Sequence, residues 1–115
     1  ARYALDFARH HAGIRHQGRF RIARELRARG VPDRHITGAL DQAFAETDET
    51  AMVRKLIERR LRLARGPLDN KKMASLYRTL LRAGFDAQLI RQELRKVGAA
   101  RGGELPEPDL AEEDS

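Results

Sequence analysis

The 115-residue sequence contains no cysteine and no tryptophan, and only 5% of its residues are aromatic. Without cysteine the chain has no disulfide framework, no zinc ribbon and no thiol nucleophile, which suits a reducing compartment. No apolar run approaches the roughly 20 residues that a transmembrane helix needs, and residues 1–3 do not open a signal peptide. The length excludes a large multidomain enzyme. We therefore expect a small cytoplasmic protein with no membrane partner and, because residue 1 is not Met, a piece of a longer chain.

Signals for catalysis and for metal binding are also scarce. Neither of the two serines has the context of a catalytic triad, and there is no glycine-rich phosphate loop or paired carboxylate array. His10, His11 and His16 lie close together in the sequence, but adjacent helical positions diverge by about 100° and Asp6 is the only nearby carboxylate. We expect these histidines to face solvent or phosphate groups, and we expect no catalytic residue, no metal site and no cofactor.

Charge is abundant and unevenly distributed. The chain has 23 Lys and Arg against 17 Asp and Glu, which gives a formal net charge of +6. Every basic residue lies at or before Arg101, and 11 of the acidic residues precede residue 104, so residues 1–103 carry +12 and residues 104–115 carry −6. A basic body favours polyanions or an acidic protein groove, and an acidic tail can compete for the same surface.

Apolar residues recur at helical spacing throughout, whereas strand signals are scarce. Val53, Leu56, Ile57 and Leu61 share one face of a helix that begins near Asp48 as its N-cap. Similar patterns predict five more segments: a helix ending near Gly13, one from Gly18 to Gly30, one restarting at residues 31–33, one over 69–83 ending at Gly84, and one from Asp86 to just before Gly98. The chain is predicted to be all-α.

A shift of 54 residues aligns the chain with itself. Arg24, Leu26, Gly30, Ile36 and Leu40 fall on identical residues without a gap. The matched positions are Arg78, Leu80, Gly84, Ile90 and Leu94. We expect tandem three-helix repeats at 1–46 and 47–98, which form an elongated helical array, followed by a disordered acidic tail at 99–115 that has almost nothing to bury. The alternative is that any two helical hairpins ending in glycine look alike.

Outward-facing cations recur on successive predicted helices. They form a candidate binding face made of Arg21, Arg24, Arg27, Lys55, Arg59, Arg62, Arg78 and Arg82. Such residues hold phosphates or carboxylates by charge-assisted hydrogen bonds. The alternative is a solvated surface without a ligand.

Two further arginines and one phenylalanine lie outside this face. Arg29 and Arg60 fall on the inward side, where we expect buried methylene stems and solvated heads. Phe20 is either exposed between arginines or partly buried against the preceding loop. Residues 18–44 are compatible with a helix-turn-helix, but the second helix offers only Arg34, His35 and Thr37 near its start, so sequence-specific base readout is not expected.

Two segments contain motifs that are found together in one known family. Residues 18–31 show a glycine, a basic helix containing Glu25-Leu26, and then Gly30-Val31. This order resembles the core motif of the RecX family. Residues 80–85, followed by Ile90 and Leu94, resemble its last repeat, and residues 48–51 resemble the link between repeats. The resemblance covers about residues 2–97, as the last two of the family's three repeats. This chain has a longer loop before the middle helix, at residues 12–18, and an acidic tail outside the family pattern.

The resemblance implies a regulator of the RecA recombinase. Its relatives lodge along the groove of the RecA filament on DNA and modulate, mostly inhibit, its recombinase, ATPase and coprotease activities, and thus the SOS response and DNA repair. It implies the RecA filament and non-specific single- or double-stranded DNA as partners of a monomeric chain. Two alternatives are a basic nucleic-acid-binding module without a RecA partner and a helical protein–protein adaptor.

Overall fold

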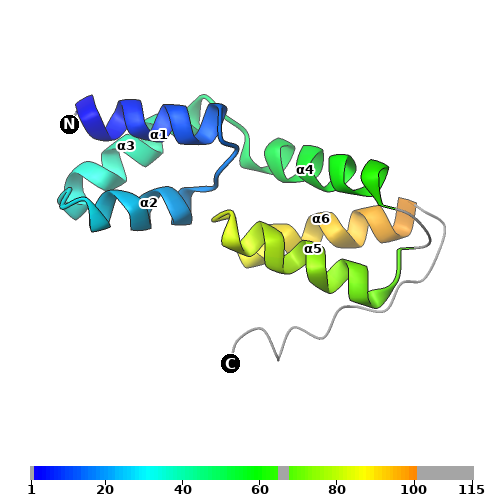
Figure 1. Ribbon diagram of the computed structural model, residues 1–115. Helices are drawn as coiled ribbons and strands as arrows, with labels where there is room; N and C mark the ends of the chain where they lie inside the picture. The colour runs from blue at the N-terminus through cyan, green and yellow to red at the C-terminus, as the bar shows by residue number, and fades with distance from the viewer. Residues whose placement is uncertain (1, 65–67, 101–115) are drawn as a thin grey trace.

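The computed structural model describes residues 2–64 and 68–100, and this part of the chain forms six α-helices and no strand. The helices are α1 (Arg2–Gly13), α2 (Arg19–Ala28), α3 (Asp33–Ala45), α4 (Glu49–Leu63), α5 (Asn70–Arg82) and α6 (Ala87–Ala100). Figure 1 shows α1–α3 and α4–α6 as two three-helix units side by side, and the molecule measures 47 × 30 × 20 Å. The predicted all-α, elongated array of three-helix repeats is confirmed. None of the helices in the described ranges is long and apolar enough to cross a bilayer.

Each three-helix unit has its own core. In the first, Ala4, Ala8 and Ala12 present one face of α1, at a spacing of four residues, to the cluster that contains Ile22 and Ile36. These alanines let α1 approach its neighbours closely, while the larger Tyr3 is 53% exposed. In the second unit, Val53 and Ile57 of α4 meet a cluster from the other two helices and the loops that precede them. Its remaining buried members are Leu68, Met73, Leu76, Tyr77, Leu80, Phe85, Ile90 and Leu94.

The helix boundaries follow local chemistry. The Asp48 carboxylate accepts a hydrogen bond from the Thr50 N–H at 2.9 Å and that of Asp69 accepts one from the Lys72 N–H at 2.8 Å, so both side chains cap helices. Gly30 and Gly84 follow α2 and α5 with φ of +88° and +102°, a conformation that favours glycine. The two glycines matched by the 54-residue shift thus end equivalent helices.

The last helix is longer than predicted. It passes through Gly98, which is buried, and ends at Ala100, so the predicted end before Gly98 was wrong. The two alanines that follow Gly98 are strong helix formers and outweigh the cost of one glycine. The expected disordered tail falls, from residue 101 onward, outside the described residues.

Backbone hydrogen bonds join the two units where the end of α5 meets the start of α2 (Figure 1). The Gly18 N–H donates to the Ala83 carbonyl at 2.8 Å, and the Phe20 N–H donates to the Gly84 carbonyl at 3.0 Å. The unpaired N–H groups at the start of one helix therefore satisfy carbonyls just beyond the end of another. A Cβ added to Gly84 would lie 2.5 Å from the Arg21 backbone N, and one added to Gly18 would lie 2.5 Å from the Gly84 carbonyl carbon. Only glycine permits this approach, which we call the glycine junction.

Candidate functional site

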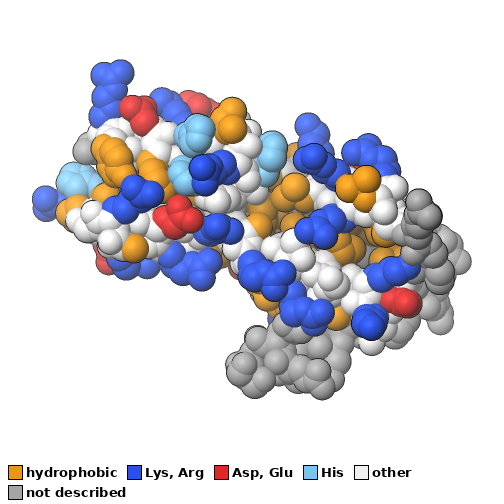
Figure 2. Space-filling model, viewed as in Figure 1, with side chains coloured by type: hydrophobic (Ala, Val, Ile, Leu, Met, Phe, Trp, Pro, Cys, Tyr) orange, Lys and Arg blue, Asp and Glu red, His pale blue; other side chains and the backbone are white. Residues whose placement is uncertain are grey.

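The eight cations of the predicted binding face remain near the surface but do not form one continuous face. Five lie on α5 and α2, which meet at the glycine junction, and three lie on α4. Arg21 and Arg78 are half-buried, while the other six side chains are exposed. Figure 2 shows many Lys and Arg side chains on the face of the molecule that it presents. The structure thus divides the predicted face into an α5–α2 group and an α4 group.

The α5–α2 group follows two helices arranged end to end. In Figure 1, α5 runs toward the glycine junction and α2 runs away from it, so the last residue of α5, Arg82, and the α2 helix that carries Arg24 lie on either side of the junction. Among the described residues, neither Arg24 nor Arg82 forms an ion pair, whereas Arg27 lies 3.0 Å from the Asp33 carboxylate. Arg24 and Arg82 are therefore available to an external anion.

Arg21 has a structural partner on each side of the junction. Its Nε donates to the Glu25 carboxylate at 3.2 Å, and its Nη1 reaches the Arg82 carbonyl oxygen at 3.5 Å. The side chain therefore links α2 to the last turn of α5. Both contacts engage its guanidinium group within the chain.

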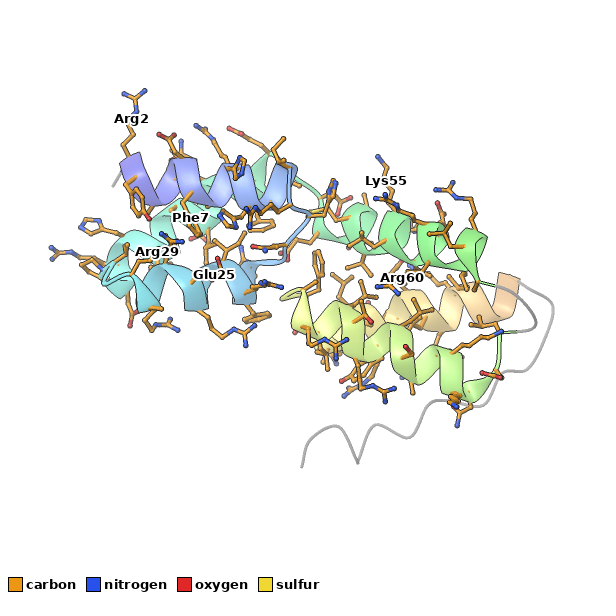
Figure 3. The ribbon with its side chains drawn as sticks, in the orientation of Figure 1. Arg2, Phe7, Glu25, Arg29, Lys55 and Arg60 are labelled. Atoms are coloured by element: carbon orange, nitrogen blue, oxygen red, sulfur yellow. The ribbon has the colours of Figure 1, made fainter. Side chains whose placement is uncertain are left out.

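The α4 group borders a hollow of about 620 Å³ between the first and second units. Lys55, Arg59 and Arg62 line it together with His16. The same hollow also contains Glu46, Asp48 and Glu58, so its charge is mixed rather than purely basic. Figure 3 shows Lys55 pointing away from α5, which separates it from the α5–α2 group.

A second set of contacts supports the junction from the α3–α4 side. Arg19 lies 3.3 Å from the Glu49 carboxylate, and its guanidinium sits 5.5 Å from the centroid of the Phe44 ring. Burial raises the pKa of Glu49 above its ordinary value, with Asp86 adding to the increase and Arg19 opposing it. This pair joins the starts of α2 and α4.

The histidine cluster differs from the sequence prediction. His11 is buried rather than facing solvent or phosphate, and its Nδ1 lies 2.8 Å from the Gln17 side-chain oxygen. Its ring stacks on Phe7 at 3.9 Å, and Glu25 lies 3.8 Å away. The prediction was wrong for His11 because a local polar partner and an aromatic face compensate its burial. No group of possible metal ligands occurs within residues 2–64 and 68–100.

The sequence reasoning also missed a buried carboxylate. Glu93 on α6 is 2% exposed, and it accepts hydrogen bonds from Arg54 at 2.8 Å and Lys96 at 3.0 Å. The hydrogen bond from Arg54 holds the pKa of Glu93 below its ordinary value, despite burial, and Lys96 adds to the effect. The Lys96 spacing was visible in the sequence, but the contact with Arg54, 39 residues away, required the fold.

Arg29 and Arg60, which the sequence placed on the inward side, and Phe20 have different environments. Arg29 is exposed, with its guanidinium 5.0 Å from the Phe7 ring centroid, and Figure 3 shows the two side chains facing each other. Arg60 is also exposed and lines a groove between α4 and α5. Phe20 is 51% exposed at the start of α2, which favours the exposed alternative.

Comparison with known proteins gave a family and a set of relatives. The family model described as RecX, second three-helix domain, matches residues 1–40, which contain α1, α2 and the first part of α3. A search of solved structures found none that matches.

Curated relatives match most of this chain. "Regulatory protein RecX" of Thermobifida fusca is 34% identical over 102 residues, which are 89% of this chain and 54% of that protein. The proteins of the same name from Leptothrix cholodnii and Ectopseudomonas mendocina are 35% and 36% identical and cover 83% and 76% of this chain, but 61% and 47% of themselves. The chain thus spans about half the length of the curated relatives it matches, and their names are those of regulatory proteins rather than enzymes.

Proposed function

The chain is related to the RecX regulatory proteins over most of its length, and from this premise we propose that it regulates the RecA recombinase. It binds along the groove of the RecA–DNA filament in the cytoplasm, as a monomer without a cofactor, and lowers recombinase, ATPase and coprotease activity. The match of residues 1–40 to a second three-helix domain supports assigning residues 47–98 to the repeat that follows it. We keep the boundaries at 1–46 and 47–98 as part of the proposal.

The observation that carries this proposal is the basic path across the glycine junction. Arg82 and Arg24 come from different three-helix units, yet backbone hydrogen bonds fix the helices that carry them. A rigid spacing between cations suits a target whose acidic groups or phosphates repeat along a filament, because less conformational entropy is lost on binding. The six exposed cations of the α5–α2 and α4 groups are the proposed contacts, and Arg21 and Arg78 belong to the α5–α2 group in half-buried positions.

The test is RecA ATPase on single-stranded DNA, titrated with this chain. Replacing Arg24 or Arg82 by Ala should raise the half-inhibitory concentration about two- to fivefold, since each exposed charge contact contributes about 0.5–1 kcal/mol. The thermal midpoint should stay unchanged because neither side chain forms an ion pair among the described residues. Arg34→Ala is the matched control, since Arg34 is an exposed arginine on α3, outside the proposed face.

The results also separate the proposal from its two alternatives. One outcome is that the chain binds DNA equally well with and without RecA, with an affinity that depends only on Arg24 and on salt concentration. In that case a general nucleic-acid-binding module explains the basic surface better. If the chain has no affinity for DNA or for the filament near physiological salt, a helical adaptor with another partner takes precedence. Inhibition that is equally sensitive to Arg34 would contradict the proposed face.

A further inference from the structure

A groove runs between α4 and α5 of the second three-helix unit. Two hollows of about 170 and 280 Å³ share Arg60, Leu76 and Thr79 as lining residues, so they adjoin each other. The buried side chains of Leu68 and Leu80 line opposite ends. We call this continuous depression the α4–α5 groove, and Figure 2 shows hydrophobic side chains between basic ones over these helices.

The groove combines apolar walls with positive charge. Four cations line it, namely Arg15, Arg59, Arg60 and Lys72. No acidic side chain occurs among its described lining residues, in contrast to the mixed hollow beside Lys55. In Figure 3, Arg60 lies between α4 and α5, whereas Lys55 points away. A partner for this groove needs carboxylates or other anions together with a few apolar groups.

The chain itself contains a segment with this composition. Residues 104–115 carry six acidic residues, no basic residue, and two leucines, Leu105 and Leu110. Pro106 and Pro108 favour an extended conformation that leaves backbone groups and alternating side chains open to contact. Charge and apolar content therefore both complement the α4–α5 groove.

We propose that residues 104–115 dock in the α4–α5 groove of the same molecule as an acidic internal ligand. The leucines of the segment pack on the leucines of the groove, and its carboxylates pair with Arg60, Lys72 and their neighbours. The occupied groove includes Arg59, a member of the α4 group, so the docked segment screens part of the cationic surface. This inference does not depend on the proposed function.

The covalent connection is long enough for this arrangement. In Figure 1, the end of α6 lies at the same end of the second unit as the end of α4 and the start of α5. Residues 101–103 span up to about 10 Å when extended. The groove follows the whole of α5, about 20 Å at 1.5 Å per residue, with Leu68 before the helix and Ala83 after it among the lining residues. Twelve residues in an extended polyproline conformation cover about 37 Å, and Leu105 and Leu110 lie about 15 Å apart.

Tethering also makes weak contacts sufficient. A segment joined to its site by a short flexible linker experiences an effective concentration in the millimolar range. Individual carboxylate–guanidinium contacts at a surface contribute only about 0.2–1 kcal/mol, but several of them act together in a tethered segment. Docking is consequently expected to be well populated at low salt and to weaken as salt rises.

The absence of cysteine provides a direct test. A single Ala111→Cys substitution in the full chain accepts one nitroxide spin label, and its broadening of backbone amide NMR signals reports the position of the tail. At low salt, the signals of Ser75 and Thr79 on α5 should lose at least half their intensity, while those of α3 should stay unchanged. Arg60→Glu combined with Lys72→Glu should remove the effect.

Controls distinguish docking in the groove from diffuse attraction to basic surfaces and from contact with a second copy. Lys71→Glu makes the same charge change at an exposed position beside Lys72 and outside the groove, so it should leave most of the broadening intact. Broadening distributed over all basic surfaces, or lost equally in Lys71→Glu, would overturn the proposal. A mixing experiment tests for a second copy: an isotope-labelled chain without a nitroxide is mixed with a spin-labelled chain at natural isotope abundance. Broadening of the isotope-labelled signals would also overturn the proposal, because the tail would then occupy the groove of another molecule.

Discussion

At the scale of single residues, the least ordinary feature is the carboxylate of Glu93 inside a small and otherwise apolar core. It is nearly inaccessible, but Arg54 of α4 and Lys96 of α6 both donate hydrogen bonds to it. The two cationic side chains are themselves 49% and 64% exposed, so they retain part of their hydration while neutralising the buried charge. The arrangement attaches α4 to α6 at modest desolvation cost.

This network predicts a pH-dependent contribution to stability. Replacing Glu93 by Gln should lower the free energy of unfolding by about 1–2 kcal/mol at neutral pH, because charge-assisted hydrogen bonds are replaced by weaker ones. The pKa of Glu93 is lowered from 4.5 in the folded state, so its contribution is present above pH 4.5 and is lost as pH falls through the folded pKa. Urea denaturation should therefore show the two proteins converging in acid.

Glu58→Gln provides the control for this measurement. Glu58 is an exposed acid on α4 that forms no ion pair with the described residues and acts on Arg54 only as a nearby, solvent-screened charge, so the same substitution there should change the free energy of unfolding by less than about 0.5 kcal/mol. A constant difference between the wild-type chain and Glu93→Gln at every pH would refute the electrostatic origin of the stabilisation.

At the scale of helices, the contact between α5 and α2 determines how the two units are arranged. The N-terminal end of a helix carries partial positive charge and its C-terminal end carries partial negative charge. The start of α2 and the residues just after α5 meet in this complementary orientation, with two backbone hydrogen bonds between them. Side chains cannot replace this contact because both glycines lie too close to backbone atoms.

Two glycines with similar dihedral angles isolate the effect of this close approach. Gly84→Ala should destabilise the chain by about 2 kcal/mol more than Gly30→Ala, as measured by denaturant unfolding, because its Cβ would overlap the backbone of Arg21. Both substitutions place alanine in the left-handed region at a cost of about 1–2 kcal/mol, but a Cβ at Gly30 meets nothing within 4 Å. Equal destabilisation by the two variants would show that the backbone at the glycine junction can shift to accommodate a Cβ without loss of stability.

How much of this arrangement the sequence reveals depends on the range of the interaction. Asp48, Gly30 and Gly84 act on their own helix ends, and local rules predicted them correctly. The alanine face of α1 gave little signal because alanine is common on both buried and exposed helix surfaces. The junction between Gly18 and Gly84 gave none, since these residues are 66 positions apart and pair only after both units have folded.

The candidate site shows the same limit. Helical periodicity placed all eight cations on outward faces, and six of them are exposed, but it did not reveal that the three cations of α4 border a hollow in which the cations of α5 and α2 take no part. Periodicity also placed Arg60 inward, whereas it lines the α4–α5 groove. The direction of a side chain relative to its own helix is a local property, but its neighbours depend on how the helices pack.

At the scale of the whole molecule, the charge of the chain has two parts of opposite sign. Residues 1–103 carry +12, and the segment 104–115 carries −6 on the same molecule. Affinity for a polyanion depends on how many counterions the protein displaces, and an internal anion that pairs with the same cations reduces that number. The acidic segment should therefore affect both the affinity for nucleic acid and its dependence on salt.

Ending the chain at Gly103 should strengthen binding to single-stranded DNA about three- to tenfold at about 50 mM salt, because the removed segment no longer competes for the cations. Fluorescence anisotropy with a labelled oligonucleotide should also give a steeper plot of log affinity against log salt, by roughly 0.7 for each additional phosphate contacted. A full-length chain with its six tail acids changed to their amides should behave like the truncated one, which separates charge from length. Parallel salt plots for all three proteins would show that the acidic segment does not reach the cations, even if the body binds DNA.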